Sequence, residues 1–240
     1  MCSFQHAQLT YTLKLLTMNV LAIDTSTAIC SVALLNKGRQ FKRRAVVSGK
    51  HSSVLFEQIQ QVVKEANCEL SEIESVIYAA GPGSYTGLRV GGSAIKGLLF
   101  PHSGIPFYAA STLASFACCA ITDVQPRTIH ALIDARRQHA YYQSFSFDGE
   151  QLRAESQPEI KLLTDIRVRL MPGDHVIGTG LSRLSQNDLA EFYMHPEEDI
   201  DATGLLKLIS YDKEKAFIRT EDIRLFEPDY MSGSTWNHAN

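Results

Sequence analysis

Two short polar turns carry the residue types that could bind a nucleotide. Asp24-Thr25-Ser26 follows a predicted strand at 19–23, and Asp134 follows a second predicted strand at 128–133. An aspartate at a strand end, followed by hydroxyl groups, could hold the metal and the phosphates of a nucleotide. Two such turns facing each other across a cleft would clamp ATP. Asp24, Thr25 and Ser26 are therefore the candidate nucleotide contacts.

The second turn lacks the glycines that such a clamp needs. No glycine stands between Asp134 and Tyr142, and Arg136 and Arg137 occupy the place where backbone N–H groups would approach the phosphates. Their guanidinium groups could still contact a phosphate. The clamp is half missing, so ATP turnover by this chain alone is not expected.

Other catalytic and metal-binding patterns are missing from the sequence. There is no H-E-x-x-H, no pair of histidines four residues apart and no G-x-S-x-G elbow. A metal site built from distant segments cannot be recognised in this way. The 5 cysteines include no C-x-x-C, which favours buried thiols over disulfides or a zinc site. We therefore predict no catalytic residue and no metal ligand.

A glycine-rich stretch, GPGSYTGLRVGGSAIKGL, begins at Gly81 and has neither the dinucleotide spacing nor the P-loop spacing. Its first residues predict a tight turn, with a hydroxyl residue capping the helix that follows. Three further glycines lie inside that helix, and each costs roughly 1 kcal/mol relative to alanine. Because Gly87, Gly91 and Ala94 share one face, we expect that face to pack closely against a neighbouring helix.

Hydrophobic periodicity predicts an α/β protein whose elements place these turns. The strand-turn-strand opening of the first part recurs after residue 127, which indicates a duplicated architecture. Expected strands are 19–23, 29–35, 40–47, 75–80, 106–110, 128–133, 139–147, 150–159 and 174–177, and expected helices are 51–67, 88–100, 112–121, 162–170, 203–209 and 213–218.

The predicted organisation is a pair of βββαβα-type lobes, the second one truncated. Residues 18–110 are expected to form the N-terminal lobe, and residues 111–240 the shortened second lobe with its connecting helix. We expect residues 1–17 to be a poorly ordered extension.

Charge and hydropathy exclude some function classes. A net charge of −3 argues against a protein that coats nucleic acid through bulk electrostatics. No apolar run approaches the roughly 20 residues of a membrane span, and the N-terminus does not have the pattern of a secretory signal. We expect a cytoplasmic protein with no membrane partner.

Several segments together resemble the TsaB (YeaZ) family. They are MNVLAIDTSTAICSVALL, GKHSSVLFEQI, GPGSYTGLRVGGSAIKGL and LIDARRQHAYYQSF, and the resemblance runs from Met18 to about Gly180. It implies the actin-like ATPase (ASKHA) fold. It also implies a non-catalytic subunit that binds and stabilises TsaD, in the complex that makes N6-threonylcarbamoyladenosine at position 37 of tRNAs reading ANN codons.

The resemblance implies partners and an interface as well. TsaD would bind directly through the helices at 51–67 and 86–100. TsaE would join through the complex, and this chain would contact tRNA only indirectly. A homodimer through the same helices is a further option. The interface residues carried over are His51, Leu55, Gly87, Arg89, Gly91 and Ala94. No cofactor is expected on this chain alone, with ATP or ADP in the assembled complex.

Two alternatives to this function stay open from the residues. The first is an ATP-dependent phosphotransferase of the sugar-kinase type, with an atypical second phosphate turn. The second, weaker alternative is a glycoprotease-like peptidase. Nucleotide binding and turnover by the isolated chain would separate these classes from a partner subunit.

Overall fold

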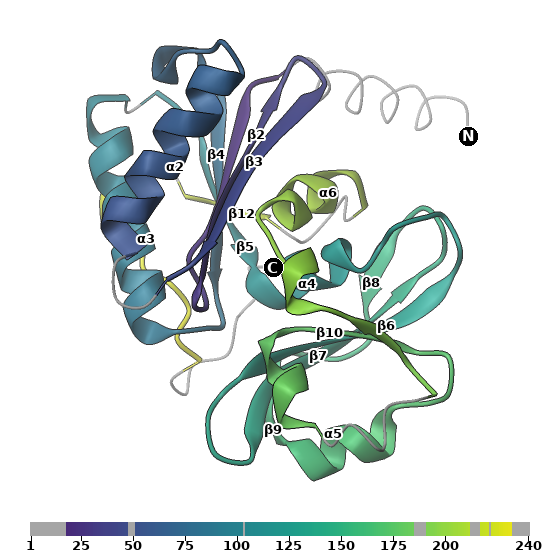
Figure 1. Ribbon diagram of the computed structural model, residues 1–240. Coiled ribbons are helices and arrows are strands. Elements are labelled where there is room, and N and C mark those ends of the chain that lie inside the picture. The colour runs from purple at the N-terminus through teal and green to yellow at the C-terminus, as the bar shows by residue number, and fades with distance from the viewer. Residues whose placement is uncertain are drawn as a thin grey trace.

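The computed structural model describes residues 18–47, 51–102, 104–184, 191–211, 217–220 and 222–231. The predicted N-terminal extension, residues 1–17, lies outside them. Two mixed β-sheets, each with helices packed on it, form the two lobes of the chain (Figure 1).

The first sheet contains the predicted β-meander. Its strand order is β12-β5-β4-β1-β2-β3, with β1, β2 and β3 antiparallel and with β4 and β5 parallel to β1. The strands are β1 (Val20–Asp24), β2 (Ile29–Asn36), β3 (Arg39–Val46), β4 (Ser75–Gly81), β5 (Phe107–Ser111) and β12 (Phe217–Thr220). β1 and β2 are buried on both faces, because helices cover both sides of the sheet.

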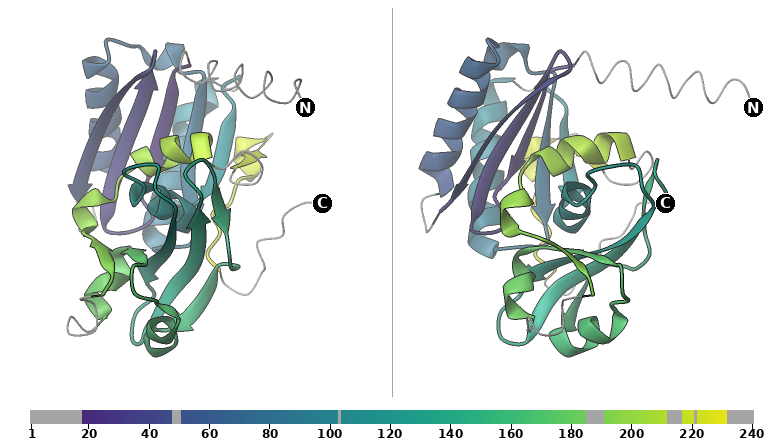
Figure 2. Two further views of the ribbon diagram at one scale, coloured as in Figure 1. Left: turned by 90° about the vertical axis from the view of Figure 1, so that its right-hand side faces the viewer. Right: turned by 45° about the vertical axis from the view of Figure 1, so that its right-hand side comes forward.

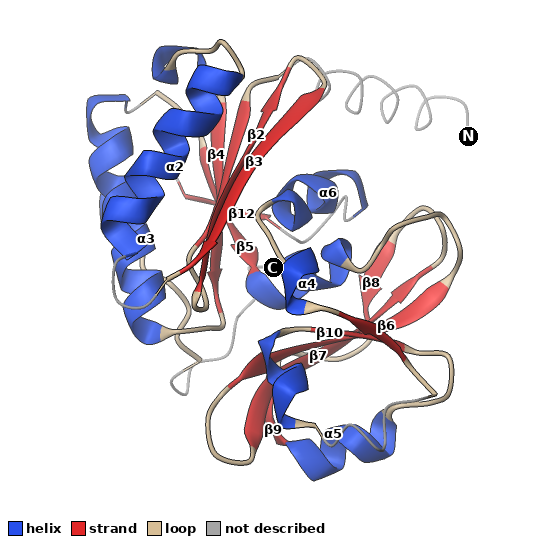
Figure 3. Cartoon of the chain, viewed as in Figure 1, coloured by secondary structure: helices blue, strands red, loops and turns tan. Residues whose placement is uncertain are grey.

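Helices α2 (His51–Glu65) and α3 (Tyr85–Leu99) lie side by side on the outer face of the first sheet (Figure 3). Helices α4 (Thr112–Cys119) and α6 (Thr203–Tyr211) cover its inner face, between the two lobes. Residues of β1 alternate between the two cores, with Leu21 and Ile23 facing α2 and α3 and Val20 and Ala22 facing α4 and α6.

The second sheet repeats the order of the first in a shorter form, β11-β10-β6-β7-β8. The third strand of this lobe is split, because β8 and β9 pair with different parts of β7. The elements are β6 (Arg127–Asp134), β7 (His139–Phe147), β8 (Leu152–Ala154), β9 (Glu159–Leu162), α5 (Leu163–Arg169), β10 (His175–Ile177) and β11 (Tyr193–His195). Where the first lobe has α3, this lobe has only a short 3-10 turn at Thr179–Arg183. The predicted actin-like fold with a truncated second lobe is confirmed.

The C-terminal part of the chain returns to the first lobe. β12 pairs antiparallel with β5, so Phe217 and Ile218 lie in a strand and not in the helix predicted for 213–218, whose other residues lie outside the described parts of the chain. Figure 2 shows this yellow strand at the edge of the first sheet. The sequence pattern assigns all of 111–240 to the second lobe, whereas β12 completes the sheet of the first. The remaining 3-10 turns in the described residues are Leu70–Glu72, Phe100–His102, Glu197–Asp199 and Ile223–Leu225.

Polar contacts connect β3 to the segment before α6. Lys42 Nζ lies 2.7 Å from Asp201 Oδ2, and Arg44 donates to the carbonyl oxygens of Ile200 and Glu197, each at 2.9 Å. Asp201 also caps α6 by accepting from the Thr203 backbone N–H. These contacts tie the inner face of the first sheet to residues 197–203.

Candidate functional site

The β1–β2 turn, which was predicted to contact a nucleotide, is closed within the chain. Asp24 is 3% exposed, and Thr25 and Ser26 are fully buried. The backbone N–H and the hydroxyl of Ser26 donate to Asp24 Oδ1 at 2.8 and 2.6 Å. Burial raises the pKa of Asp24 to about 6, although the Ser26 hydrogen bonds oppose this shift. The turn is closed to solvent in this structure. A nucleotide contact through it therefore stays a prediction.

The glycine-rich loop covers this turn with backbone rather than side chains. Ser84 N–H donates to the Ser26 carbonyl at 2.5 Å. A Cβ added to Gly83 would overlap that same carbonyl, and one added to Gly87 would overlap the carbonyl of Thr25. Ser84 caps α3 as predicted, because its Oγ accepts from the Gly87 backbone N–H. The loop is a packing and capping element in this structure, not an open phosphate cradle.

Gly91 packs against a buried pair of hydroxyl groups. Thr25 Oγ1 donates to the Gly87 carbonyl at 2.9 Å, and the Tyr78 hydroxyl donates to the Leu88 carbonyl at 2.8 Å. A Cβ added to Gly91 would overlap both hydroxyl groups. The prediction that Gly91 and Gly87 face a partner helix is wrong, because both glycines face the chain's own β1–β2 turn.

Other predicted interface residues are also buried within the chain. His51 Nε2 lies 2.9 Å from the Thr27 carbonyl oxygen, while Leu55 is fully buried and Ala94 is 9% exposed. Helical spacing correctly indicated that such residues share a face. It could not tell whether that face packs on the chain's own sheet or on a partner. Arg89 alone of the predicted set is exposed, and its partner role stays a proposal.

The exposed side of α3 forms a different stripe. Thr86, Arg89, Ser93, Gly97 and Phe100 recur at helical spacing and are all exposed. A Cβ added to Gly97 would meet nothing within 4 Å. On neighbouring α2, exposed residues include Ser52, Phe56 and Gln60. We call these eight residues the outer α2–α3 face.

A cluster of aromatic residues adjoins the start of this face. The rings of Tyr85 and Tyr230 are 4.7 Å apart, and the Arg89 guanidinium lies over the Tyr85 ring. Asp229 N–H donates to the Ala80 carbonyl at 2.8 Å, which fixes the C-terminal segment on the end of β4. Pro228 and Phe226 lie against Gly92 of α3. Sequence reasoning missed this cluster, although the string Glu227-Pro228-Asp229-Tyr230 was the available signal.

The β6–β7 turn repeats the local geometry of the β1–β2 turn. Asp134 Oδ1 accepts from the Arg136 backbone N–H at 2.8 Å, just as Asp24 Oδ1 accepts from the Ser26 backbone N–H. The two turns differ in burial, since Arg136 and Arg137 are exposed. Each lobe therefore keeps the aspartate turn of the expected clamp, but of the two turns only the second offers charged side chains to solvent.

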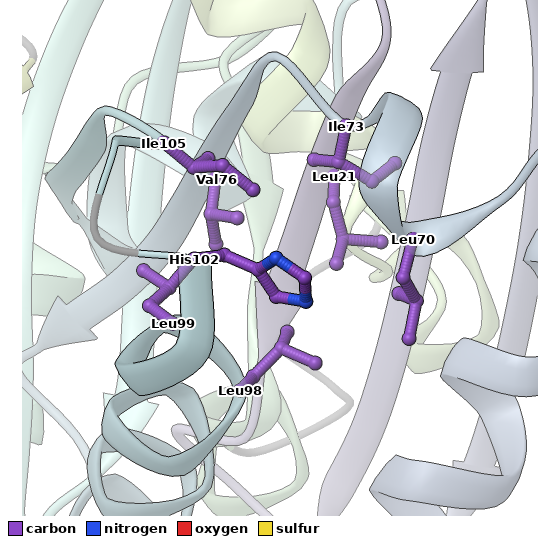
Figure 4. A pocket seen from close by; sticks show the side chains of 8 residues that line it. All are labelled: Leu21, Leu70, Ile73, Val76, Leu98, Leu99, His102 and Ile105. Carbon is purple, nitrogen blue, oxygen red and sulfur yellow. The ribbon is translucent and has the colours of Figure 1, made fainter.

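Within the described residues, no group of three or more His, Cys, Asp or Glu side chains is arranged to hold a metal. A small crevice beside α3 is lined by aliphatic side chains, among them Leu21, Leu70 and Leu98, and the ring of His102 points in among them (Figure 4). It offers no carboxylate or hydroxyl group to a nucleotide. No helix in the described parts of the chain has the length and hydropathy to cross a membrane.

A buried polar network crosses the second lobe. His130 Nδ1 lies 2.8 Å from the Tyr142 hydroxyl, and His130 Nε2 lies 2.9 Å from Asp174 Oδ2. Burial lowers the pKa of His130, although Asp174 opposes this effect. Since Asp174 Oδ2 also accepts from the Met171 backbone N–H, the network joins β6, β7 and the start of β10. Its groups satisfy one another, as expected for a structural network.

Comparisons of the sequence with known proteins give matches that agree with one another. A family model described as TsaD, tRNA N6-adenosine threonylcarbamoyltransferase, matches residues 45–194. The tRNA threonylcarbamoyladenosine biosynthesis protein TsaB of Escherichia coli K12 is 32% identical over 170 residues, which cover 68% of this chain and 72% of that protein. The TsaB protein of Bacillus subtilis 168 is 28% identical over 149 residues, which cover 62% of this chain and 64% of that protein.

Solved structures agree with the sequence comparisons. The structure of YeaZ from Pseudomonas aeruginosa has a TM-score of 0.67 and 27% identity, and covers 80% of this chain and 90% of that one. A structure described as an uncharacterized protein with similarity to peptidase YeaZ from Pseudomonas aeruginosa has a TM-score of 0.70 and 26% identity, with coverage of 89% and 99%.

Proposed function

Because the chain belongs to the TsaB (YeaZ) family, which takes part in tRNA threonylcarbamoyladenosine biosynthesis, we propose that it is a non-catalytic subunit that binds and stabilises TsaD. The TsaD-containing complex would make N6-threonylcarbamoyladenosine at position 37 of tRNAs reading ANN codons. This chain would supply a binding surface rather than reacting groups.

The outer α2–α3 face is the observation that carries this proposal. It includes Phe56 of α2 and Phe100 at the end of α3, exposed by 42% and 77%, and the uncovered Gly97. A glycine with free space above it lets the backbone of a second helix approach closely, and exposed aromatic rings supply contact area. Arg89 and Tyr85 at one end are residue types enriched at the centres of protein interfaces.

Burial of Asp24, Thr25 and Ser26 supports a subunit without chemistry of its own. The turn that would hold a nucleotide's metal and phosphates is covered by the Gly83–Gly87 backbone. In this proposal ATP or ADP is bound in the assembled complex, which TsaE joins, and not by this chain alone. A homodimer through the outer α2–α3 face would compete with TsaD for the same surface.

The test is a reconstitution with purified components. The isolated chain should show no ATP turnover, while its addition to TsaD, TsaE and the threonylcarbamoyl donor should raise the yield of modified tRNA. Mass analysis of the digested tRNA measures that yield. Robust ATP hydrolysis by the isolated chain would instead favour a phosphotransferase, and an unchanged tRNA yield would contradict the subunit role.

A further inference from the structure

The β6–β7 turn presents cationic side chains that are free of partners in the described part of the chain. Arg136 and Arg137 are exposed, and no acidic side chain or carbonyl oxygen there contacts their guanidinium groups. Some other exposed arginines are paired, for example Arg153 with Asp148 and Arg224 with Asp222. The charges of Arg136 and Arg137 are therefore available to a ligand.

The backbone of this turn is held in an unusual conformation. Arg136 and Arg137 have φ angles of 70° and 56°, and the described residues include no other consecutive pair of non-glycine residues with positive φ. Long side chains rarely adopt this region, and glycine would be the ordinary choice. Backbone strain that the surrounding structure maintains is concentrated at functional sites.

Neighbouring groups hold the backbone of the turn and neutralise the charge of its carboxylate, Asp134. Asp134 Oδ1 accepts from the Arg136 backbone N–H, and Arg183 donates to the Arg137 carbonyl oxygen. Arg183 Nη1 also lies 3.8 Å from Asp134 Oδ2. Because Arg183 offsets Asp134, both charges of Arg136 and Arg137 are in excess at this edge of a chain whose net charge is −3.

We propose that the β6–β7 turn binds the phosphate backbone of RNA, with Arg136 and Arg137 each contacting a phosphate. The planar guanidinium group matches a phosphate in a bidentate manner, and two adjacent groups suit a chain of phosphates better than a single small anion. The inference rests on the proposed function, because the RNA in question is the tRNA on which that pathway acts.

The test uses the full chain and an unmodified tRNA transcript that reads an ANN codon. Binding is measured by fluorescence anisotropy at about 50 mM and about 200 mM salt. Replacing both arginines with glycine, R136G/R137G, should weaken binding at low salt. Since each lost phosphate contact reduces the slope of log K against log salt by about one, the wild-type chain should lose about tenfold more affinity than the variant over this range.

Two controls separate the turn from general effects. The variant K37Q/R153Q removes the same charge at other exposed positions and should bind tRNA like the wild type. Glycine adopts positive φ freely, so R136G/R137G should melt no lower than the wild type. If it does melt lower, R136N/R137N repeats the test with a residue that tolerates this backbone.

Two results would overturn the proposal. The first is an equal loss of tRNA affinity in R136G/R137G and K37Q/R153Q. The second is a tRNA affinity of R136G/R137G that equals that of the wild type. Competition by polyglutamate as strong as that by RNA would overturn it in favour of an acidic protein partner. Binding to TsaD is measured in parallel: intact TsaD binding without RNA binding refutes this inference alone, whereas wild-type failure to bind TsaD refutes the proposed function.

Discussion

The hydroxyl group of Thr25 occupies the space that a side chain at Gly91 would need. Through this contact, α3 packs directly on the β1–β2 turn, and Thr25 can donate to the backbone of the same helix. The glycine at position 91 is thus required by the fold of the chain itself.

Replacing Gly91 with alanine should therefore destabilise the monomer. Alanine gains about 1 kcal/mol of helix propensity, whereas overpacking against Thr25 and Tyr78 typically costs 1–3 kcal/mol, so we expect a net loss of up to about 2 kcal/mol. Urea denaturation measures the difference. Gly97→Ala is the matched control in the same helix and should gain up to about 1 kcal/mol, because its Cβ meets nothing. Equal stability of the two variants would contradict this assignment of the helix faces.

Replacing Asp24 with asparagine should stabilise the fold at neutral pH. The pKa of Asp24 is raised from 3.8 to about 6, so between these values the native state binds more protons than the unfolded state. The cost of the buried carboxylate is absent below pH 3.8 and fully present above pH 6. That cost corresponds to about 3 kcal/mol, which is the upper limit of the gain expected at pH 7.5.

The asparagine side chain also suits this site. Its Oδ1 can accept from the Ser26 N–H. Ser31 is the cross-strand neighbour of Asp24, and its buried Oγ has no hydrogen-bond partner in the described residues. That Oγ could accept a hydrogen bond from the asparagine amide group. Thermal melts at pH 7.5 and pH 4.5 measure the effect. The gain should shrink at the lower pH; a variant less stable than the wild type at pH 7.5 would show that the charge of Asp24 is favourable.

Tyr85 and Tyr230 should stabilise each other across the junction of α3 and the C-terminal segment. Aromatic pairs contribute about 0.5–1.5 kcal/mol, and because Tyr85 is 56% exposed we expect a coupling energy near the lower end of that range. A double-mutant cycle with Tyr85→Ala and Tyr230→Ala measures it. Additive effects of the two substitutions would mean that the rings merely lie near each other.

Local patterns predicted much of the fold. The alternating turns and apolar runs of 18–147 gave both hairpins, and the run after Gly81 gave the tight turn and the Ser84 cap. These features depend on neighbours in the sequence, so periodicity and turn residues are sufficient to find them.

Long-range contacts set the features that the sequence did not predict. Gly91 and Gly97 lie in the same helix and have the same local propensity, but one faces a buried hydroxyl and the other open space. β12 is a strand because it pairs with β5 across more than a hundred residues of sequence, which no local pattern encodes. The left-handed backbone of Arg136 and Arg137 likewise depends on Asp134 and on Arg183 from a distant turn.

The most direct test of the outer α2–α3 face as the TsaD-binding surface is calorimetric titration of TsaD with the Gly97→Leu variant. Leucine has free space in the isolated chain and favours the helix, so the monomer should stay folded by circular dichroism. If a partner helix approaches at Gly97, the added side chain should cost about 1–3 kcal/mol of binding free energy, or about tenfold to a hundredfold in affinity. A smaller loss is expected for Gly97→Ala. Unchanged affinity of a folded Gly97→Leu variant for TsaD would contradict the account.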